Sequence, residues 1–169
     1  MAVRRGGLTT IAVHAGERYD STTGAVGTPI YQNSTFYYPR RPDASGKWVD
    51  SEFIYTRYSN PTTRAAEEKL AALEGTEDAI CFASGMAAIA AANLSLVKPG
   101  ENIVAQANVY GGSTTLFNNE FKRLGIGTKY SFEGTVESFL ALVDEKTRVV
   151  FVEAPSNPFN FIVDLPRLA

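Results

Sequence analysis

Apolar residues recur at regular intervals only in the second part of the chain. An Asn-Pro pair at residues 60–61 predicts a helix start, since asparagine caps helices and proline suits their first position. Ala66, Leu70 and Leu73 then recur at helical spacing and predict one apolar face. Gly75 predicts the end of this helix, because glycine readily adopts the left-handed conformation that terminates helices.

Strands and helices alternate along the rest of this region. Strands are predicted at residues 78–82, 102–106, 128–132 and 148–153, and helices at 86–97, 114–124 and 136–143. This order is typical of an α/β sheet with right-handed crossovers. The apolar character of the strands predicts helices on both faces, with the strand at 78–82 and the Ala-rich helix at 86–97 both buried. A further helix begins near residue 165, so we expect the α/β domain to be incomplete.

The first 58 residues differ from the rest in residue types and in periodicity. They are rich in Thr, Tyr, Gly, Pro and Arg and show no sustained helical or strand period. Such a segment seldom folds alone, so we expect an arm that lies on another surface, with an exposed loop at residues 39–47. The predicted organisation is therefore an arm over residues 1–58 and an incomplete α/β domain over residues 59–169.

Composition narrows the classes of function. The 169 residues carry 16 Lys and Arg against 18 Asp and Glu, a formal charge of −2, which argues against nucleic acid or an anionic membrane as the main partner. Cys81 is the only cysteine and His14 the only histidine, so the sequence predicts neither an internal disulfide nor a His/Cys metal cluster. Without a long apolar run or a signal peptide, we expect a soluble, cytoplasmic protein.

Candidate chemistry lies in the loops that follow the strands, because ligands of α/β sheets bind beyond the carboxyl ends of the strands. The first loop contains Ser84 and Gly85, at the start of the predicted helix. A helix start offers backbone N–H groups and a positive dipole end, which suit a phosphate, and glycine allows close approach. The alternative is an ordinary capping serine, followed by a glycine that allows tight packing.

Three other segments add signals, each weak when taken alone like the first. Tyr110, before paired glycines, could offer its ring face to a planar ligand, or be a structural tyrosine before a flexible turn. Asn157, in a loop stiffened by two prolines, could hydrogen-bond a ligand or form an Asx turn. Arg57 is a forked cation suited to phosphate or carboxylate, although most such arginines are solvated. Together the loops indicate a phosphorylated planar cofactor.

The ordered motifs resemble one known family. They read YTRYSNPT at residues 55–62, SGM at 84–86, VYGGS at 109–113 and EAPSNP at 153–158, preceded by VHAG at 13–16 and PIYQNSTF at 29–36. This set is similar to the Cys/Met-metabolism, or trans-sulfuration, family of pyridoxal-phosphate enzymes, and it covers nearly the whole chain. The resemblance implies the first part of a fold type I PLP-binding domain, as in aspartate aminotransferase.

The resemblance also implies roles for single residues. Gly85 and Met86 would offer backbone N–H groups to the cofactor phosphate, and Tyr110 would stack on the pyridine ring and assist proton transfer. Asn157 would hydrogen-bond the ring hydroxyl. Tyr55 and Arg57 would reach the phosphate of a neighbouring subunit's cofactor, which would explain the arm and implies a tetramer built from two active-site dimers.

One departure from the family pattern is severe. PLP chemistry needs a Schiff-base lysine and a carboxylate at the pyridine nitrogen, and the family carries both downstream of the Asn-Pro loop. The lysines of this chain are Lys47, Lys69, Lys98, Lys122, Lys129 and Lys146. None has the family context, so no Schiff-base lysine is assigned. Asp164 corresponds to a helix start that precedes the cofactor carboxylate of the family.

Three hypotheses follow. The chain is the N-terminal portion of an enzyme that acts on sulfur or homoserine-type amino acids by γ- or β-elimination or replacement. Alternatively it is an inactive short protein, or half of an assembly completed by a C-terminal chain. The third hypothesis, an unrelated phosphate-binding domain, conflicts with the motif set. Gly112, where some methionine-specific relatives have cysteine, favours cystathionine or acetylhomoserine chemistry. We expect the isolated chain to show no lyase turnover.

Overall fold

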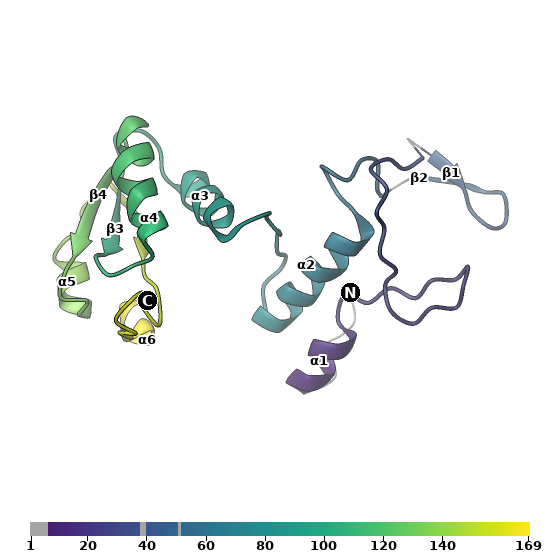
Figure 1. Ribbon diagram of the computed structural model, residues 1–169, viewed down its shortest axis with the longest axis horizontal. Coiled ribbons are helices and arrows are strands. Elements are labelled where there is room, and N and C mark those ends of the chain that lie inside the picture. Colours follow the sequence, from purple (N-terminus) through teal and green to yellow (C-terminus); the bar gives the residue numbers. More distant parts are fainter. Residues whose placement is uncertain (1–6, 38–39, 51) are drawn as a thin grey trace. The chain divides into compact units, whose positions relative to one another are not determined.

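The computed structural model describes residues 7–37, 40–50 and 52–169 (Figure 1). The chain divides into two compact units, residues 1–81 and residues 82–169, each with its own fold. The boundary expected from the sequence, between an arm ending at residue 58 and a domain starting at residue 59, stays a prediction. Among the described helices, none is both long and apolar enough to cross a membrane.

The longest helix of the first unit, α2 (Pro61–Glu74), has the predicted ends. Asn60 caps it, because its side-chain oxygen accepts a hydrogen bond from the backbone N–H of Thr62 at 2.9 Å. Pro61 occupies the first helical position, where an N–H would have no partner within the helix. Gly75 ends α2 in the left-handed conformation, with φ of 70°. These features confirm the capping signals read from the sequence.

The apolar face predicted for α2 is wrong. Ala65 is buried, whereas Ala66 and Leu70 are exposed. The reason is that α1 (Leu8–His14) and the turn after it pack against the alanine side of α2. A Cβ built on Gly16 would lie 2.1 Å from the carbonyl oxygen of Ala65, so the two backbones touch at a glycine. Close backbone contact selects small residues rather than leucines.

The first unit contains two elements that the sequence pattern did not reveal, α1 and a hairpin. In the hairpin, β1 (Arg40–Pro42) pairs antiparallel with β2 (Trp48–Asp50), inside and just beyond the segment predicted as a loop. The turn between them follows the prediction, since the Asp43 carboxylate accepts backbone N–H bonds from Ser45 and Lys47 at 2.9 and 3.0 Å. Position 39 of that predicted loop lies outside the described residues. Strands of three residues are too short to show a period-2 pattern.

The second unit is built on a three-stranded parallel sheet with the order β4-β3-β5. Its strands are β3 (Asn102–Gln106), β4 (Gly127–Ser131) and β5 (Thr147–Phe151). All five residues of the central strand β3 are buried. The prediction at residues 102–106 is confirmed, and the other two strands lie within one or two residues of their predicted ranges.

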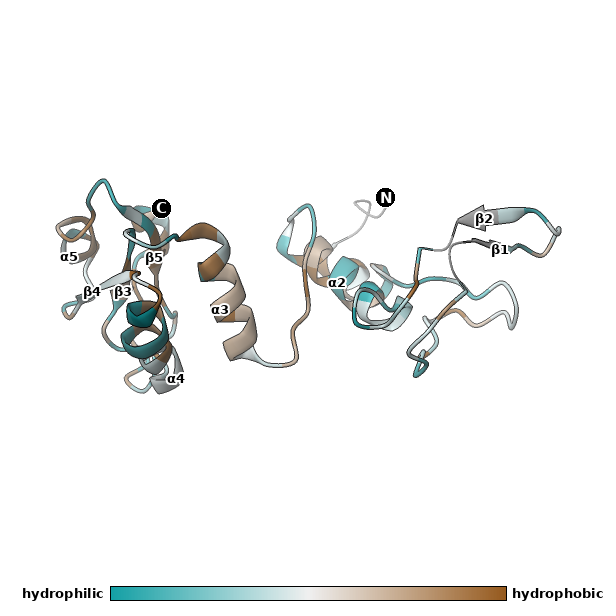
Figure 2. Cartoon of the chain, turned by 90° about the horizontal axis from the view of Figure 1, so that it is seen from above, coloured by the Kyte–Doolittle hydropathy of each residue, from teal (hydrophilic) through white to brown (hydrophobic). Residues whose placement is uncertain are grey.

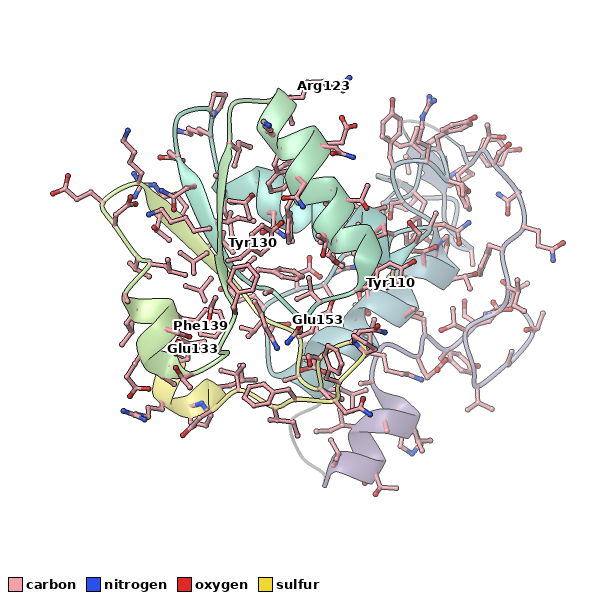
Figure 3. All side chains as sticks on the ribbon, turned by 60° about the vertical axis from the view of Figure 1, so that its left-hand side comes forward. Tyr110, Arg123, Tyr130, Glu133, Phe139 and Glu153 are labelled. Carbon is pink, nitrogen blue, oxygen red and sulfur yellow. The ribbon has the colours of Figure 1, made fainter. Side chains whose placement is uncertain are left out.

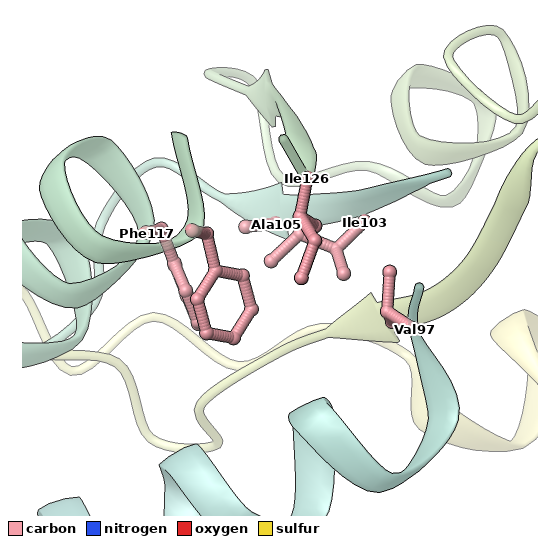
Figure 4. Packing of buried hydrophobic residues seen from close by; sticks show 6 residues of the cluster. Val97, Ile103, Ala105, Phe117 and Ile126 are labelled. Carbon is pink, nitrogen blue, oxygen red and sulfur yellow. The ribbon is translucent and has the colours of Figure 1, made fainter. Parts of the chain in front are cut away.

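Helices cover both faces of this sheet, as predicted. They are α3 (Gly85–Leu96), α4 (Gly111–Thr115) with a π-helical continuation (Leu116–Phe121), α5 (Val136–Leu140) and α6 (Leu165–Leu168). One face carries a cluster of Val97, Ile103, Ala105, Phe117, Phe121 and Ile126 (Figure 4). The other face packs Val104 against Phe139 and Val163. This two-sided core is typical of an α/β sheet, and it holds the strand ends in place for the loops that follow.

The predicted buried strand at residues 78–82 is wrong. This segment has no strand structure, Ile80 is 73% exposed and Cys81 is exposed. Its N–H groups bind carboxylates instead of a neighbouring strand: the N–H of Cys81 donates to Glu67 at 2.9 Å, and that of Ala79 donates to Asp78 at 2.9 Å. A strand needs a partner for its ladder, and these side chains take the ladder's place.

The helix predicted at residues 86–97 exists as α3, but it is not buried. Figure 2 shows that α3 is hydrophobic along its length, yet Leu94 and Leu96 are 42% and 60% exposed. Within the helix, among the described residues, only Asn93 is classed as buried. A three-stranded sheet covers one side of α3, through residues such as Ile89. A helix that is apolar on all sides therefore keeps its other sides exposed in this unit.

Candidate functional site

The turn before α3 presents backbone donors to solvent. Ser84 caps the helix: its Oγ accepts from the N–H of Ala87 and its carbonyl oxygen accepts from the N–H of Ala88, each at 3.1 Å. Helix geometry leaves the N–H groups of Gly85 and Met86 without an acceptor inside the helix. Gly85 is exposed, and a Cβ built on it meets nothing within 4 Å. This open start of a 12-residue helix suits an anion.

Tyr110 lies between the end of β3 and the start of α4, and its side chain is 53% exposed. A Cβ built on Gly112 would lie 2.5 Å from Cε1 of Tyr110 and 3.0 Å from Sδ of Met86. The Tyr110 ring and the Met86 side chain therefore both adjoin Gly112. The structure thus brings together two of the predicted site loops, with the Tyr110 ring and the Met86 side chain both beside Gly112.

Glu153 connects the Tyr110 loop to the end of β5. Both carboxylate oxygens of Glu153 accept from the backbone N–H of Tyr110, at 3.0 and 2.9 Å, and Figure 3 shows the two residues at the same end of the sheet. The sequence pattern assigned Glu153 no role of its own. An acidic residue at the end of the most β-branched strand was the signal, but its partner lies 43 residues away.

Asn157 lies exposed in the loop after β5. The loop closes on the buried Ser156, whose N–H donates to the carbonyl oxygen of Phe161 at 2.9 Å and whose Oγ accepts from the Phe161 N–H at 3.1 Å. Asn157 thus follows the end of β5 by six residues, at the same sheet edge as Glu153. Its place agrees with the prediction of a loop residue beyond the carboxyl end of a strand.

Tyr55 and Arg57 belong to the first unit. The Arg57 guanidinium lies over the rings of Tyr55 and Tyr58, at 5.2 and 5.6 Å from their centroids. The segment is tied to the earlier arm motif, because Thr56 donates from N to the Ser34 carbonyl at 2.8 Å and Tyr55 forms a bridge with Thr35. The two arm motifs therefore form one local structure that presents an exposed arginine.

The lysines of the second unit lie away from these loops. Lys98, Lys122 and Lys146 precede β3, β4 and β5 respectively, at the amino ends of the strands. Lys129 in β4 is held by Asp144, with Nζ 2.7 Å from Oδ2, and by the Leu142 carbonyl at 2.8 Å. Hydrogen bonds from Lys129, above all, keep the pKa of the Asp144 carboxyl below its ordinary value.

The sequence also led to predictions about Asp164 and about metal binding. Asp164 caps α6 by accepting from the Arg167 N–H at 3.2 Å, which agrees with its interpretation as a helix start. Across residues 7–37, 40–50 and 52–169, no group of three His, Cys, Asp or Glu side chains could hold a metal ion. The described site is therefore made of backbone donors, one exposed ring and one amide.

The model of the Cys/Met metabolism PLP-dependent enzyme family matches residues 9–169. The chain belongs to this family. The cofactor of this family is pyridoxal phosphate. The chain spans about 40% of the length of the curated relatives it matches. The resemblance inferred from the six motifs is thus confirmed over nearly the whole chain.

Two relatives and one solved structure illustrate the likeness. The chain is 37% identical over 162 residues to an O-succinylhomoserine sulfhydrylase of Pseudomonas aeruginosa, covering 95% of this chain and 40% of the relative. It is 43% identical over 164 residues to a cystathionine beta-lyase of Coxiella burnetii, covering 96% and 40%. The metY structure of Campylobacter jejuni, which carries a pyridoxyl-lysine-5'-monophosphate residue, matches with a TM-score of 0.82 and 30% identity, covering 95% and 40%.

These matches confirm the predicted fold class. The parallel sheet with helices on both faces is the first part of the PLP-binding domain of a fold type I enzyme. The relatives include both a sulfhydrylase and a lyase. The class of reaction, the substrate and the reaction of this chain belong to the proposal below.

Proposed function

We propose that this chain forms the phosphate- and ring-binding portion of a PLP-dependent enzyme that acts on sulfur or homoserine-type amino acids. The reaction would be γ- or β-elimination or replacement, as in cystathionine lyases and homoserine-ester sulfhydrylases. The observation that carries the proposal is the open start of α3, together with Gly112, against which both the Met86 side chain from that start and the Tyr110 ring lie. A phosphorylated planar molecule needs this combination of an anion site beside a ring face.

The phosphate is assigned to the N–H groups of Gly85 and Met86. Both donors lie at the positive end of the α3 dipole, and the space around Gly85 is open. Ser84 keeps its Oγ engaged with Ala87 as the cap, so the two preceding N–H groups are the ones left for an anion. This supports the roles that the family resemblance implied for these residues.

The ring of the cofactor is assigned to Tyr110 and Asn157. Tyr110 offers an exposed face for stacking, and its hydroxyl can hold or move a proton at the leaving group. Asn157 can donate to the ring hydroxyl from the loop after β5. When bound, pyridoxal phosphate supplies an electron sink for the carbanion formed at the substrate Cα.

A second candidate is a catalytically inactive short or split-chain homologue that acts as an assembly partner. The placement of the lysines favours it for the isolated chain, since three of them lie at the amino ends of the strands and Lys129 is ion-paired. Under both candidates, Tyr55 and Arg57 would bind the cofactor phosphate of a neighbouring subunit. The assembly would be a homotetramer of two active-site dimers, or a complex with a complementing C-terminal chain, in the cytoplasm.

Two substitutions at position 85 test the phosphate site. Gly85→Pro removes the N–H at the first helical position, where proline is tolerated, and Ser84 before it is already extended, with φ −155° and ψ 155°. We expect pyridoxal phosphate to bind about tenfold or more weakly, because a hydrogen bond to a charged group contributes about 1.5–3 kcal/mol. Phosphorus NMR titration of the 169-residue chain measures the affinity.

Gly85→Ala is the matched control. Alanine also adds a Cβ but keeps the N–H, so the difference between the two variants isolates the hydrogen bond. Their α-helical circular dichroism should be the same. Equal affinity of the alanine and proline variants, or no binding by the unmodified chain, would overturn the assignment of the phosphate to this turn.

A further inference from the structure

A chain of hydrogen bonds runs from the buried centre of the sheet to Tyr110. Gln106, the last residue of β3, is 1% exposed, and its Oε1 accepts from the backbone N–H of Glu153 at 3.2 Å. The carboxylate of Glu153 then accepts from the backbone N–H of Tyr110 with both oxygens, at 3.0 and 2.9 Å. The end of β5 is thus fixed to β3 through Gln106, and the Tyr110 loop is fixed to the end of β5.

The backbone of Tyr110 is held on both sides. Its N–H binds Glu153, while its carbonyl oxygen accepts from the N–H groups of Ser113 and Thr114 at 2.9 and 3.2 Å. Its ring adjoins the bare surface of Gly112, where even one added carbon would lie 2.5 Å from Cε1. The direction of this half-exposed ring therefore depends on the position of its backbone.

A carboxylate suits this task better than a neutral acceptor. Two oxygens that share one N–H hold the donor along the axis of the carboxylate, and a charged acceptor makes a stronger hydrogen bond than a neutral one. Glutamine at the same position would keep one acceptor oxygen and lose the charge. The Glu153 carboxylate therefore holds the Tyr110 backbone in place at the edge of the sheet.

We infer that Glu153 is the positioning residue for the Tyr110 ring: its carboxylate holds the Tyr110 backbone so that the ring face lies where a planar cofactor stacks. This rests on the proposed function for the identity of the cofactor, while the anchoring of Tyr110 stands on the contacts themselves. Glu153 acts through Tyr110, so its effect on the cofactor should disappear when the Tyr110 ring is absent.

The first measurement is amide hydrogen exchange of Tyr110, followed by NMR on the 169-residue chain without cofactor. In Glu153→Ala the Tyr110 amide should exchange about tenfold faster or more, because its acceptor is gone, while the amides of residues 103–105 in β3 keep their protection. Glu153→Gln should restore part of the protection. Unchanged exchange at Tyr110, or equal acceleration in β3, would overturn the inference.

The second measurement is a double-mutant cycle on pyridoxal phosphate affinity with Glu153→Ala, Tyr110→Ala and the double variant. We expect each single variant to weaken binding, and the double variant to bind within about twofold of Tyr110→Ala alone. Losses that multiply would show that Glu153 acts independently of the ring and would overturn the inference. Glu133→Ala, at an exposed carboxylate of the same unit, is the control and should bind as the unmodified chain does.

The two measurements separate the two proposals. If the unmodified chain fails to bind pyridoxal phosphate, the proposed function fails, and the exchange of the Tyr110 amide still decides whether Glu153 anchors it. If the cofactor binds but exchange at Tyr110 is insensitive to Glu153, the proposed function survives and the positioning role fails.

Discussion

At the scale of single residues, Gly112 and Gly111 form a natural pair for a test. A Cβ at position 112 would meet the Tyr110 ring at 2.5 Å, whereas a Cβ at position 111 meets nothing within 4 Å. We expect Gly112→Ala to displace the half-exposed ring and weaken pyridoxal phosphate binding, with little change in stability because the ring can turn away from the added methyl group. Urea unfolding and cofactor titration measure the two effects.

Gly111→Ala should leave the affinity unchanged and stabilise the chain by about 0.5–1 kcal/mol, since alanine loses less backbone entropy than glycine in a helix. Identical behaviour of the two variants would contradict the close approach of the ring to Gly112.

The sequence predicted the local structure around the candidate site well where the signal is local, while the roles of these residues toward a ligand stay predictions. Ser84 as a cap, Gly85 at an open helix start and Asn157 in a loop beyond a strand all follow from a few neighbouring residues. Glu153 escaped prediction because its partner is a backbone N–H 43 residues away. Nothing in the side-chain pattern marks a backbone donor, so contacts of this kind become visible only in the fold.

At the scale of elements, an ion pair joins the turn after α1 to α2. Lys69 lies 2.6 Å from Glu17, and together with the Thr28 N–H it lowers the pKa of Glu17 from 4.5 to about 2. A lowered pKa in the folded state stabilises the fold above pH 4.5, and this contribution is lost as pH falls from 4.5 towards 2. We therefore expect the urea midpoint of the first unit to fall over this range.

Lys69→Met should flatten that part of the pH profile, because Glu17 then titrates closer to its ordinary value. The measurement is the difference between the variant and the unmodified chain at about pH 7 and about pH 3, which removes the contribution of other carboxyl groups. Lys122→Met, at an exposed lysine of the second unit, is the control. An equal loss of stability in acid with and without Lys69 would refute the coupling.

Elements were predictable when their signal spanned several residues. The caps of α2 and the β-branched pattern of β3 and β5 placed those elements almost correctly. The pattern at residues 78–82 was apolar enough for a strand, but strand formation needs a partner and the N–H groups there bind carboxylates instead. Short elements such as α1 depend on docking against α2, which local sequence does not encode.

At the scale of the whole molecule, the placement of the lysines predicts the behaviour of the isolated chain. We expect no release of α-keto acid from cystathionine or O-acetyl-L-homoserine above the rate with free pyridoxal phosphate, because no lysine has the family's Schiff-base context, and those of the second unit lie before the strands or, for Lys129, in an ion pair. Borohydride reduction should likewise leave no specific pyridoxyl label on a lysine. Turnover by the purified 169-residue chain would require a base that we have not identified. Addition of a chain with the family's downstream lysine is the positive control.

The class of the molecule could be predicted from sequence because its motifs occur in family order and the family match covers residues 9–169. The exposure of α3 could not, because an apolar helix gives no information about how many of its sides are covered. The division between residues 81 and 82 could not be predicted either, because it depends on long-range contacts. The sequence showed only a change in residue types near residue 58.

The meeting of Gly16 with α2 has a consequence for how sequences of this kind can diverge. Gly16 has a φ of +74°, and only 2.1 Å would separate an added Cβ from the Ala65 carbonyl oxygen, so backbone meets backbone at this position. A single methyl group at position 16 would collide with the Ala65 carbonyl group and separate α1 from α2.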